Sequence, residues 1–432
     1  MRFLGIGETN DLGDMYLRLA NAGHQVRVHM SDEDSQGVMD GMIEFTSDWR
    51  TELDWVRSVG GEGFILFETA SAGDIQDDLR QDGFQVIGGS ALGDRLENDR
   101  AYGQQVLRDL GLQTAGSHSF DGFDEAMSFV RESPGRYVFK LSGSSWSSTR
   151  TYVGQMENGL DMLALLESVR RNWTLDEDPQ GVLMDFVSGV EVGVGAFFNG
   201  RRFLSPANLD WEHKRFFPGD IGELTGEMGT VVTYRGAERI FDATLARLAP
   251  MLAESGYCGY INLNTIVNEK GIWPLEFTSR FGYPGFPILD SLHDEGWDSI
   301  FAAMVAGERN TIKVKAGLSV GVVITVPPFP YSDGYADLGK GTPISFHEPM
   351  TDADRDALHY GEVTMRDGQL LTAGMIGYVM VVTGVGETID SARERAYERV
   401  NKVIIPNMRY RNDIGARFAD DCATLERLGW LV

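Results

Sequence analysis

Cysteine and long apolar segments are nearly absent from this chain of 432 residues. Its two cysteines, Cys258 and Cys422, are too few for a disulfide framework or a cysteine-built zinc site. No apolar run approaches the roughly 20 residues that a membrane-spanning helix needs, and the first residues lack the pattern of a signal peptide. These absences predict a cytoplasmic protein that has no membrane partner.

Positive charge is also scarce, because 38 Lys and Arg stand against 64 Asp and Glu, giving a formal net charge of −26. Binding nucleic acid requires a basic face, so we expect no nucleic-acid partner. ATP is not excluded, since a local cluster of Lys and Arg with a divalent cation can hold a triphosphate in a negative protein. The length predicts two to four domains or lobes.

The first hundred residues alternate short apolar runs with polar helical stretches. This alternation predicts a βαβ array with a parallel sheet, and hence the α/β class. The expected strands are Phe3–Ile6, Gln25–His29, Phe64–Phe67 and Gln85–Ile87, with helices over Met15–Ala22 and Asp74–Gln81.

Two further regions follow, so we predict domains over residues 1–100, 101–316 and 317–432. The second contains a small β-rich lobe at about 116–198, which includes the apolar stretch Val190–Phe198. It also contains an amphipathic helix over 237–254 and a strand pair over 257–278. From about Gly317 the pattern changes to short strands and turns, closed by a helix over Ser391–Lys402.

Residues 212–229 place the basic triplet His213-Lys214-Arg215 ahead of a glycine-rich loop. Alone, this segment is best interpreted as a solvated surface turn. Farther on, Glu276 follows an apolar strand, and Arg280 lies four residues downstream. A carboxylate at a strand end can hold Mg²⁺, which prefers few carboxylates plus substrate oxygens.

Lys140 ends a predicted strand and precedes a run of small residues. A lysine there can pair with phosphate oxygens while backbone N–H groups approach them. Any strand can also end in a solvated lysine, and this segment alone favours that interpretation.

Together these segments resemble the phosphoribosylamine–glycine ligase family of the ATP-grasp superfamily. The family patterns run roughly D-H-K-R-x-x-x-G-D-x-G-P-N-T-G-G-M-G and L-E-F-N-A-R-F-G-D-P-E. The segments Gly83–Gly88 and Asn98–Phe120 are similar to A-G-I-P-V-F-G-P and S-K-x-F-x-K-x-F-M-x-x-x-G-I-P-T-A. Near the end, Tyr410–Gly415 is similar to Y-R-x-D-I-G, so the resemblance covers essentially the whole chain. It implies an ATP-grasp fold with an N-terminal βαβ domain and a C-terminal β-rich lobe.

The resemblance also implies roles for particular residues. The predicted ATP-binding residues are Lys140, Gly143, Arg150, Phe186, Val187, Glu191, Lys214 and Arg215. Among them, Arg150 replaces a lysine of the family that is missing here. Phe186 and Val187 form the adenine hinge, and Glu191 contacts the ribose. The predicted ligands of Mg²⁺ (or Mn²⁺) are Glu276, Thr278 and Asn264, with Thr278 in place of the family's asparagine. Arg280 and Lys214 are the predicted catalytic residues. Two alternatives remain open. Arg280 could form a structural ion pair, and Phe186 and Val187 could belong to an ordinary buried strand.

Departures from the family patterns cluster where its substrates lie. The family's opening G-x-G-G-R-E-H-A is replaced by Gly5-Ile6-Gly7-Glu8-Thr9-Asn10-Asp11, and its D-P-E becomes Tyr283-Pro284-Gly285. The glycine-rich loop matches almost position for position, although its P-N-T-G-G becomes Glu223-Leu224-Thr225-Gly226-Glu227. Because Tyr283 and Trp146 add aromatic rings, we expect a second substrate that is bulkier or more apolar than phosphoribosylamine.

The resulting prediction is an ATP-dependent carboxylate–amine ligase that forms an amide through an acyl-phosphate. Its partners would be ATP and a small-molecule carboxylate and amine, in a monomer or homodimer. One alternative is a genuine ligase of glycine and phosphoribosylamine. Another, of a different class, is a catalytically weakened nucleotide-binding regulatory protein.

Overall fold

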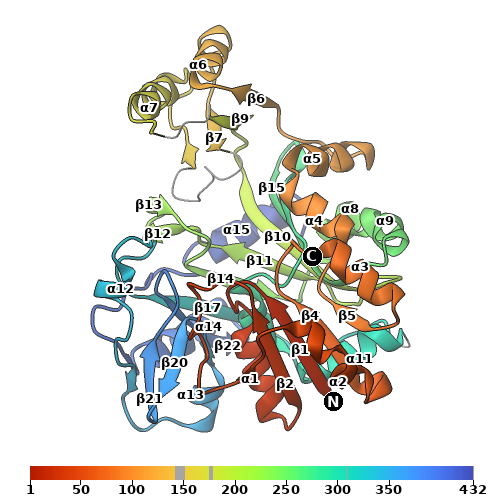
Figure 1. Ribbon diagram of the computed structural model, residues 1–432. Helices are drawn as coiled ribbons and strands as arrows, with labels where there is room; N and C mark the ends of the chain where they lie inside the picture. The colour runs from red at the N-terminus through yellow and green to blue at the C-terminus, as the bar shows by residue number, and fades with distance from the viewer. Residues whose placement is uncertain (142–150, 175–178, 308, 432) are drawn as a thin grey trace.

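The structure of the protein is a computed structural model that describes residues 1–141, 151–174, 179–307 and 309–431. The predicted site residues Gly143 and Arg150, and also Trp146, lie outside the described residues. Figure 1 shows an N-terminal sheet, a small lobe standing apart from it, and a long sheet between them. The predicted α/β class is confirmed. None of the described helices has the length and apolar character needed to cross a membrane.

The N-terminal sheet has five parallel strands, as the alternating pattern predicts. In spatial order they are β3 (Glu44–Phe45), β2 (Gln25–Met30), β1 (Arg2–Gly7), β4 (Gly63–Phe67) and β5 (Gln85–Ile87). The intervening helices are α1 (Gly13–Asn21), η1 (Trp49–Glu52), α2 (Leu53–Arg57), η2 (Gly60–Glu62) and α3 (Gly73–Gln81). Strands β1 and β4 are almost wholly buried, which is typical of a parallel sheet covered on both faces.

Two capped helices lead from this sheet toward the small lobe. The side chain of Ser90 accepts a hydrogen bond from the N–H of Gly93 at the start of α4 (Ala91–Asn98). Asp99 accepts one from the N–H of Tyr102 at the start of α5 (Arg100–Asp109). These caps satisfy N–H groups that the first turn leaves unpaired.

The small lobe is a four-stranded antiparallel sheet with a core of its own. Its strands are β6 (Ser117–Asp121), β9 (Gln180–Asp185), β7 (Tyr137–Leu141) and β8 (Tyr152–Val153), covered by α6 (Phe123–Glu132) and α7 (Leu160–Arg171). The expectation that Val190–Phe198 belongs to this lobe is wrong. That segment is part of β10 (Val190–Asn199), which pairs with strands of the large sheet. Its apolar run suits a central strand that is buried on both faces.

The large sheet has eight antiparallel strands and crosses the predicted boundary at 316/317. In spatial order they are β16 (Gly271–Thr278), β15 (Cys258–Asn268), β10, β11 (Asn208–Glu212), β14 (Gly229–Thr233), β17 (Leu318–Thr325), β22 (Tyr378–Gly386) and β19 (Leu358–Tyr360). The strand pair predicted over 257–278 is confirmed as β15 and β16. Since β14 pairs with β17, the second and third predicted domains share one sheet.

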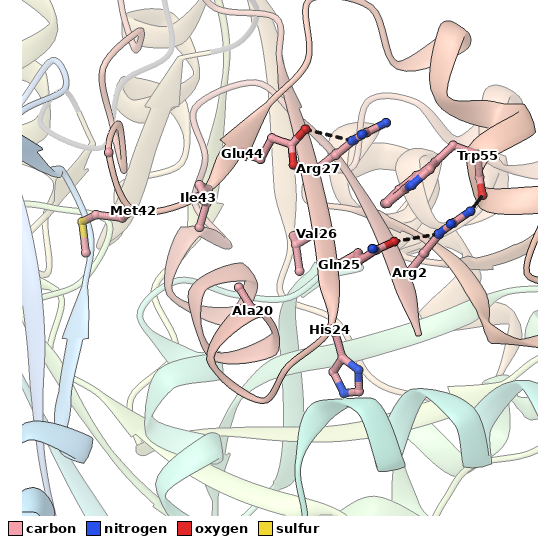
Figure 2. A pocket seen from close by; sticks show the side chains of 11 residues that line it. Arg2, Ala20, His24, Gln25, Val26, Arg27, Met42, Ile43, Glu44 and Trp55 are labelled. Atoms are coloured by element: carbon pink, nitrogen blue, oxygen red, sulfur yellow. Dashed lines mark hydrogen bonds and ion pairs between the residues drawn. The ribbon is translucent and has the colours of Figure 1, made fainter.

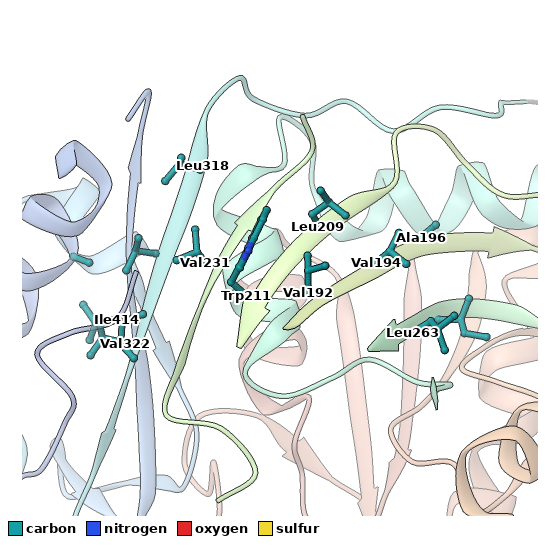
Figure 3. Packing of buried hydrophobic residues seen from close by; sticks show 14 of the residues in the cluster. Val192, Val194, Ala196, Leu209, Trp211, Val231, Leu263, Leu318, Val322 and Ile414 are labelled. Carbon is teal, nitrogen blue, oxygen red and sulfur yellow. The ribbon is translucent and has the colours of Figure 1, made fainter. Parts of the chain in front are cut away.

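The two faces of the large sheet differ in chemistry. One face is apolar, and Figure 3 shows Val192 and Val194 of β10 beside Leu209 and Trp211 of β11. On the other face, the alternate residues are polar near β16. Farther along the strands, the residues of this face belong to the aromatic core that lies under the N-terminal sheet. Side chains alternate across a strand, so this one sheet supplies both a core wall and a polar wall.

The single helix expected over 237–254 is also wrong, because the segment breaks into three pieces. They are α8 (Glu238–Ala243), η5 (Leu245–Leu248) and α9 (Ala249–Glu254). Thr244 leaves helical geometry at φ −128° and ψ −93°, and its hydroxyl donates to the carbonyl of Ile240 at 2.5 Å. Pro250 then lies in the first turn of α9, where proline is well tolerated.

The remaining elements surround the large sheet. They are β12 (Arg215–Phe217), β13 (Ile221–Leu224), α10 (Gly285–Leu292), α11 (Trp297–Ala306), α12 (Tyr335–Leu338), β18 (Ser345–Phe346), α13 (Asp352–Asp356), β20 (Val363–Arg366), β21 (Gln369–Thr372), α14 (Ile389–Val400), β23 (Val403–Ile404) and α15 (Phe418–Arg427). Helix α14 lies against β22 and β17 and buries Ala392, Ala396 and Val400.

The N-terminal sheet and the large sheet meet through backbone atoms at Gly88 and Gly259. The N–H of Gly88 donates to the carbonyl of Cys258 at 2.8 Å, and a Cβ atom on Gly259 would lie 1.9 Å from the carbonyl oxygen of Gly88. We therefore expect Gly259→Ala to lower the free energy of unfolding by about 1–3 kcal/mol. Urea unfolding followed by circular dichroism would measure it.

Gly61→Ala is the matched control, because a Cβ atom there would meet nothing within 4 Å. Equal urea midpoints for the two variants would show that the contact at Gly259 does not constrain the fold.

Candidate active site

Glu276 lies at the centre of a cluster of cations. Its Oε2 atom is 3.4 Å from Nζ of Lys140 and 3.3 Å from Nη2 of Arg100, and its Oε1 atom is 3.2 Å from Nζ of Lys214. Lys140 and Lys214 hold the pKa of Glu276 well below its usual range, despite the opposing effect of burial. The carboxylate is therefore charged and holds three cations in place.

These cations come from three separate parts of the fold. Lys140 lies on β7 of the small lobe, Arg100 begins α5, and Lys214 lies between β11 and β12. The sequence prediction missed Arg100, although the lysine of the pattern S-K-x-F aligns with it. The resemblance therefore carried a signal that could have found this residue.

Lys140 is not a solvated lysine at a strand end. Its side chain is only 19% exposed. Burial lowers its pKa, and the nearby charges of Arg100 and Lys214 lower it further, against the opposing effect of Glu276. A group crowded by like charges in this way gains from any additional anion nearby.

Lys214 is shared among three carboxylates. Its Nζ atom lies 3.1 Å from Glu212, 3.2 Å from Glu276 and 3.4 Å from Glu191. Burial alone would lower its pKa, but Glu212 and the other two carboxylates outweigh burial and raise it well above its usual range. Lys214 is therefore a permanent cation at this site.

The predicted metal ligands share one face of the large sheet. Glu276 on β16 stands opposite Asn264 on β15, and Thr278 stands opposite Asn262. Nδ2 of Asn264 donates to Oε1 of Glu191 at 2.9 Å. Among the described residues, no group of three or more His, Cys, Asp or Glu side chains is arranged to hold a metal ion. The oxygen donors present suit a magnesium ion that takes most of its ligands from phosphates and water.

Arg280 forms an ion pair with Glu97 of α4. Its Nε atom donates to Oε1 of Glu97 at 3.0 Å, and the N–H of Ser279 donates to Oε2 at 2.6 Å. Burial would lower the pKa of Arg280, but Glu97 and Asp11 raise it. The structural ion pair left open by the sequence is thus present. The side chain is still 30% exposed, so part of it can meet a ligand.

The predicted hinge residues Phe186 and Val187 lie between β9 and β10, outside any strand. The guanidinium of Arg136 lies over the ring of Phe186, 3.5 Å from its centroid, and the N–H of Phe186 donates to the carbonyl of Arg136 at 2.9 Å. Within the described part of the chain, the N–H of Val187 has no hydrogen-bond partner. Glu191 follows four residues later, on β10.

The basic triplet does not act as one positive patch. His213 is buried, and burial together with Arg417 and Arg411 lowers its pKa to about 4, so it is neutral at pH 7. Nη1 of Arg215 donates to the carbonyl of Gly222 at 2.6 Å, within its own hairpin. Within the triplet, Lys214 makes the ion pair with Glu276.

The glycine-rich loop after the triplet is held by the last lobe. Arg411 is fully buried and pairs with Asp220 and Asp413, each at 2.8 Å. Asp413 also accepts a hydrogen bond from the N–H of Gly219 at 2.8 Å. The motif Tyr410–Gly415 therefore positions the loop next to Lys214 rather than acting only within its own lobe.

Acidic residues that the sequence prediction missed lie beside Lys214. Asp210 and Glu212 of β11 and Glu227 after β13 are drawn together on the polar side of the large sheet. Gly193 leaves the space, since a Cβ atom there would lie 2.0 Å from Oδ1 of Asp210. Burial and then Glu212 raise the pKa of Asp210 to about 7, and burial raises that of Glu227 well above its usual range. Spacing alone gives no signal for such a group, because acids at alternate strand positions usually face solvent.

A groove elsewhere on the surface has a volume of about 690 Å³. Figure 2 shows Arg2, Arg27 and Trp55 along it, and both arginines are occupied by neighbouring groups of the N-terminal sheet. None of its lining residues belongs to the cluster around Glu276.

Comparison with known proteins agrees with this geometry. Residues 98–286 match the family model described as phosphoribosylglycinamide synthetase, ATP-grasp (A) domain, and residues 319–417 match the phosphoribosylglycinamide synthetase C domain. The chain belongs to the phosphoribosylamine–glycine ligase family. It is therefore an ATP-grasp enzyme of the ADP-forming carbon–nitrogen ligases.

Individual relatives and solved structures agree with this assignment. A phosphoribosylamine–glycine ligase of Listeria monocytogenes is 26% identical over 425 residues, covering 95% of each chain. The crystal structure of the Thermotoga maritima ligase has a TM-score of 0.70 at 20% identity, covering 96% of this chain and all of that one. The biotin carboxylase domain of Hydrogenobacter thermophilus 2-oxoglutarate carboxylase, solved with MgADP, has a TM-score of 0.66 at 13% identity, over 98% and 97%.

Glu68, directly after β4, is a buried carboxyl group that contacts the turn after β1. Its Oε2 atom accepts a hydrogen bond from the N–H of Asp11 at 3.1 Å, and a Cβ atom on Gly7 would lie 2.0 Å from it. Burial, and then the charge of Asp11, raise the pKa of Glu68 to about 8. The folded state therefore binds a proton that the unfolded state releases near its ordinary pKa of 4.5.

We expect the wild-type protein to lose stability as pH rises from 4.5 to about 8, and Glu68→Gln to abolish this pH dependence. Within that window the folded state binds more protons, so the free energy of unfolding falls as pH rises. Glutamine has no proton to lose. The gain in Tm over wild type should thus grow from pH 5 to pH 8, as thermal unfolding in a pH series would measure. The exposed Glu62→Gln is the control, and a parallel pH dependence of all three proteins would contradict the prediction.

Proposed function

We propose that the protein phosphorylates a small-molecule carboxylate with ATP and joins the resulting acyl-phosphate to an amine, releasing ADP and phosphate. The observation that carries this proposal is the cluster of Lys140, Arg100 and Lys214 around Glu276, between the small lobe and the large sheet. Three cations around one carboxylate suit a polyphosphate with its metal ion. A cytoplasmic location fits these substrates.

In this proposal the cluster binds the phosphates of ATP. Lys140, Arg100 and Lys214 would donate to phosphate oxygens, and Gly143, Arg150 and Arg215 stay predicted contributors. The N–H of Val187, which has no partner among the described residues, and the half-buried ring of Phe186 suit a purine base at the hinge. Glu191 would accept a hydrogen bond from the ribose. Magnesium, when bound, would supply positive charge that offsets the negative charge of the phosphates. Glu276 would hold it, with Asn264 directly and Thr278 through water.

Arg280 would bind the carboxylate that is activated. Its guanidinium is fixed by Glu97 and partly exposed, so it can donate to an anion whose charge grows in the transition state. The reaction would otherwise depend mainly on positioning and electrostatic stabilisation of the phosphoryl group.

The second part of the proposal concerns the identity of the amine substrate. Glycine and phosphoribosylamine are one candidate pair, because the curated relatives carry the name phosphoribosylamine–glycine ligase. We propose a different amine, since Tyr283, Gly285 and Glu227 alter the segments where the family patterns carry D-P-E and a second glycine. ADP release would be measured with glycine and phosphoribosylamine and, for comparison, with panels of amino acids and amines. This comparison distinguishes the two candidate reactions. ADP release that depends on that pair, at about 10 per second, would identify the family's own reaction.

We expect Glu276→Gln to reduce ADP formation by about 10²–10³-fold, a loss comparable to removing an oxyanion-hole donor. The amide keeps the shape of the side chain but loses the charge that holds the metal ion and three cations. A coupled ADP assay at limiting magnesium would measure the loss. Glu269→Gln, at an exposed turn of the same hairpin, is the control. Turnover of Glu276→Gln at the wild-type rate would exclude Glu276 as the metal ligand.

We expect Lys140→Met to raise the Kd for ATP by about 10–100-fold, since a charged hydrogen bond contributes about 1.5–3 kcal/mol. The Tm should change less, because methionine replaces the apolar stem of the lysine. Calorimetric titration with ATP would measure the Kd, and the exposed Lys340→Met serves as control. An unchanged Kd would remove Lys140 from the nucleotide site.

A further inference from the structure

Glu227 is fixed in position by backbone hydrogen bonds on both sides of it. The N–H of Thr225 donates to the carbonyl of Lys214 at 2.8 Å, and the N–H of Met228 donates to that of His213 at 2.8 Å. The family pattern has glycine at the position of Glu227. A carboxylate has therefore been added to a rigid segment directly beside Lys214.

Glu227, Asp210 and Glu212 form one acidic group, which we call the acidic trio. Glu227 and Asp210 are only 7% and 5% exposed. Oε1 of Glu227 and Oδ1 of Asp210 have no hydrogen-bond partner among the described residues. Buried carboxylate oxygens without partners are costly, so their retention points to a partner that arrives from outside.

The cation next to the trio cannot neutralise it. Lys214 lies 3.1 Å from Glu212, but it also pairs with Glu191 and Glu276. The remaining oxygen of Asp210, Oδ2, accepts uncharged donors, namely the amides of Asn262 at 2.7 Å and Asn208 at 3.1 Å. The trio thus lacks a cation of its own, and the acids hold protons instead: burial and the neighbouring acids raise the pKa of Asp210 to about 7 and that of Glu227 well above its usual range.

The trio adjoins the segment that follows Arg280. The hydroxyl of Tyr378 donates to the backbone carbonyl of Glu227, and the ring of Tyr378 lies 5.0 Å from that of Tyr283. Tyr283 also packs against Phe286, with ring centroids 6.1 Å apart, so the ring of Tyr283 already contacts other side chains of the protein. This packing argues against the apolar second substrate expected from Tyr283.

We propose that the amine substrate binds as an ammonium cation at Glu227, beside Asp210 and Glu212, and that it carries no phosphate group. The proposal rests on the ligase function proposed above. An ammonium group donates three hydrogen bonds and matches the unpartnered oxygens. An ammonium cation would take the place of the protons that these acids hold, whereas a phosphate would place its own negative charge against acidic oxygens. Glu227 is then the specificity-determining residue.

Binding can be tested without knowing the carboxylate substrate. We would titrate 1,4-diaminobutane and O-phosphoethanolamine into the protein with MgADP at constant ionic strength, comparing wild type with Glu227→Gln and Glu227→Gly. The wild type should bind the diamine at least tenfold more tightly than the phosphorylated amine. Both variants should lose at least tenfold in affinity for the diamine, and Glu223→Gln, earlier in the same loop, should not.

Two results would overturn the proposal. One is wild type binding the phosphorylated amine as tightly as the diamine, and the other is diamine affinity that does not change in Glu227→Gln. MgADP titrated alone tests the nucleotide site separately. Absent ADP binding with Glu227-dependent diamine binding would overturn the ligase function, whereas ADP binding without it would overturn the ammonium site.

Discussion

The ion cluster around Glu276 is the interaction on which the rest of the site depends. Lys140, Arg100 and Lys214 would repel one another if no anion stood between them. At about 4 Å, two unit charges interact by roughly 4 kcal/mol near a protein surface, so three unshielded cations could not share this space. Glu276 makes their approach possible, and with it the placement of the small-lobe strand β7 beside the large sheet.

This arrangement also explains how the same residues can serve two states. Without nucleotide, the carboxylate of Glu276 is the partner of all three cations. In the proposed nucleotide complex, phosphate oxygens would take over the cations and leave Glu276 to a metal ion. Because each cation exchanges one anion for another, the site can be charged and half-buried in both states.

Sequence patterns predicted the local parts of this structure well. The N-terminal strands and the β15–β16 hairpin follow from apolar periodicity, which is a property of neighbouring residues. The membership of β10 in the large sheet does not, because strand pairing joins residues far apart in the chain. The same limit applies to Arg280, whose ion pair with Glu97 spans two elements, and to the helix break at Thr244, where a side chain competes with the backbone.

The residues of the candidate site also differ in whether a local sequence motif identifies them. Lys140, Lys214 and Glu276 were identified through motifs, and the structure brings them together. Arg100 was overlooked within a motif. Glu212 and Glu227 lie in the segment 212–229 but received no role there, and Asp210 lies just before it. Asp210 depends on Gly193, its partner on the neighbouring strand β10, for the space that its carboxyl group occupies.

Lys214 connects the two halves of the proposed site. It pairs with Glu276 on the nucleotide side and with Glu212 of the acidic trio on the other. A change in charge at the trio therefore alters the field at the cation that would bind phosphate. Burial and then Glu212 raise the pKa of Glu227 well above its usual range, so without a cation Glu227 holds a proton. A cationic amine bound at the trio would take the place of that proton, and the total charge around Lys214 would stay the same. The proposed amine site could therefore fill without changing the charge that Lys214 presents to the phosphates of ATP.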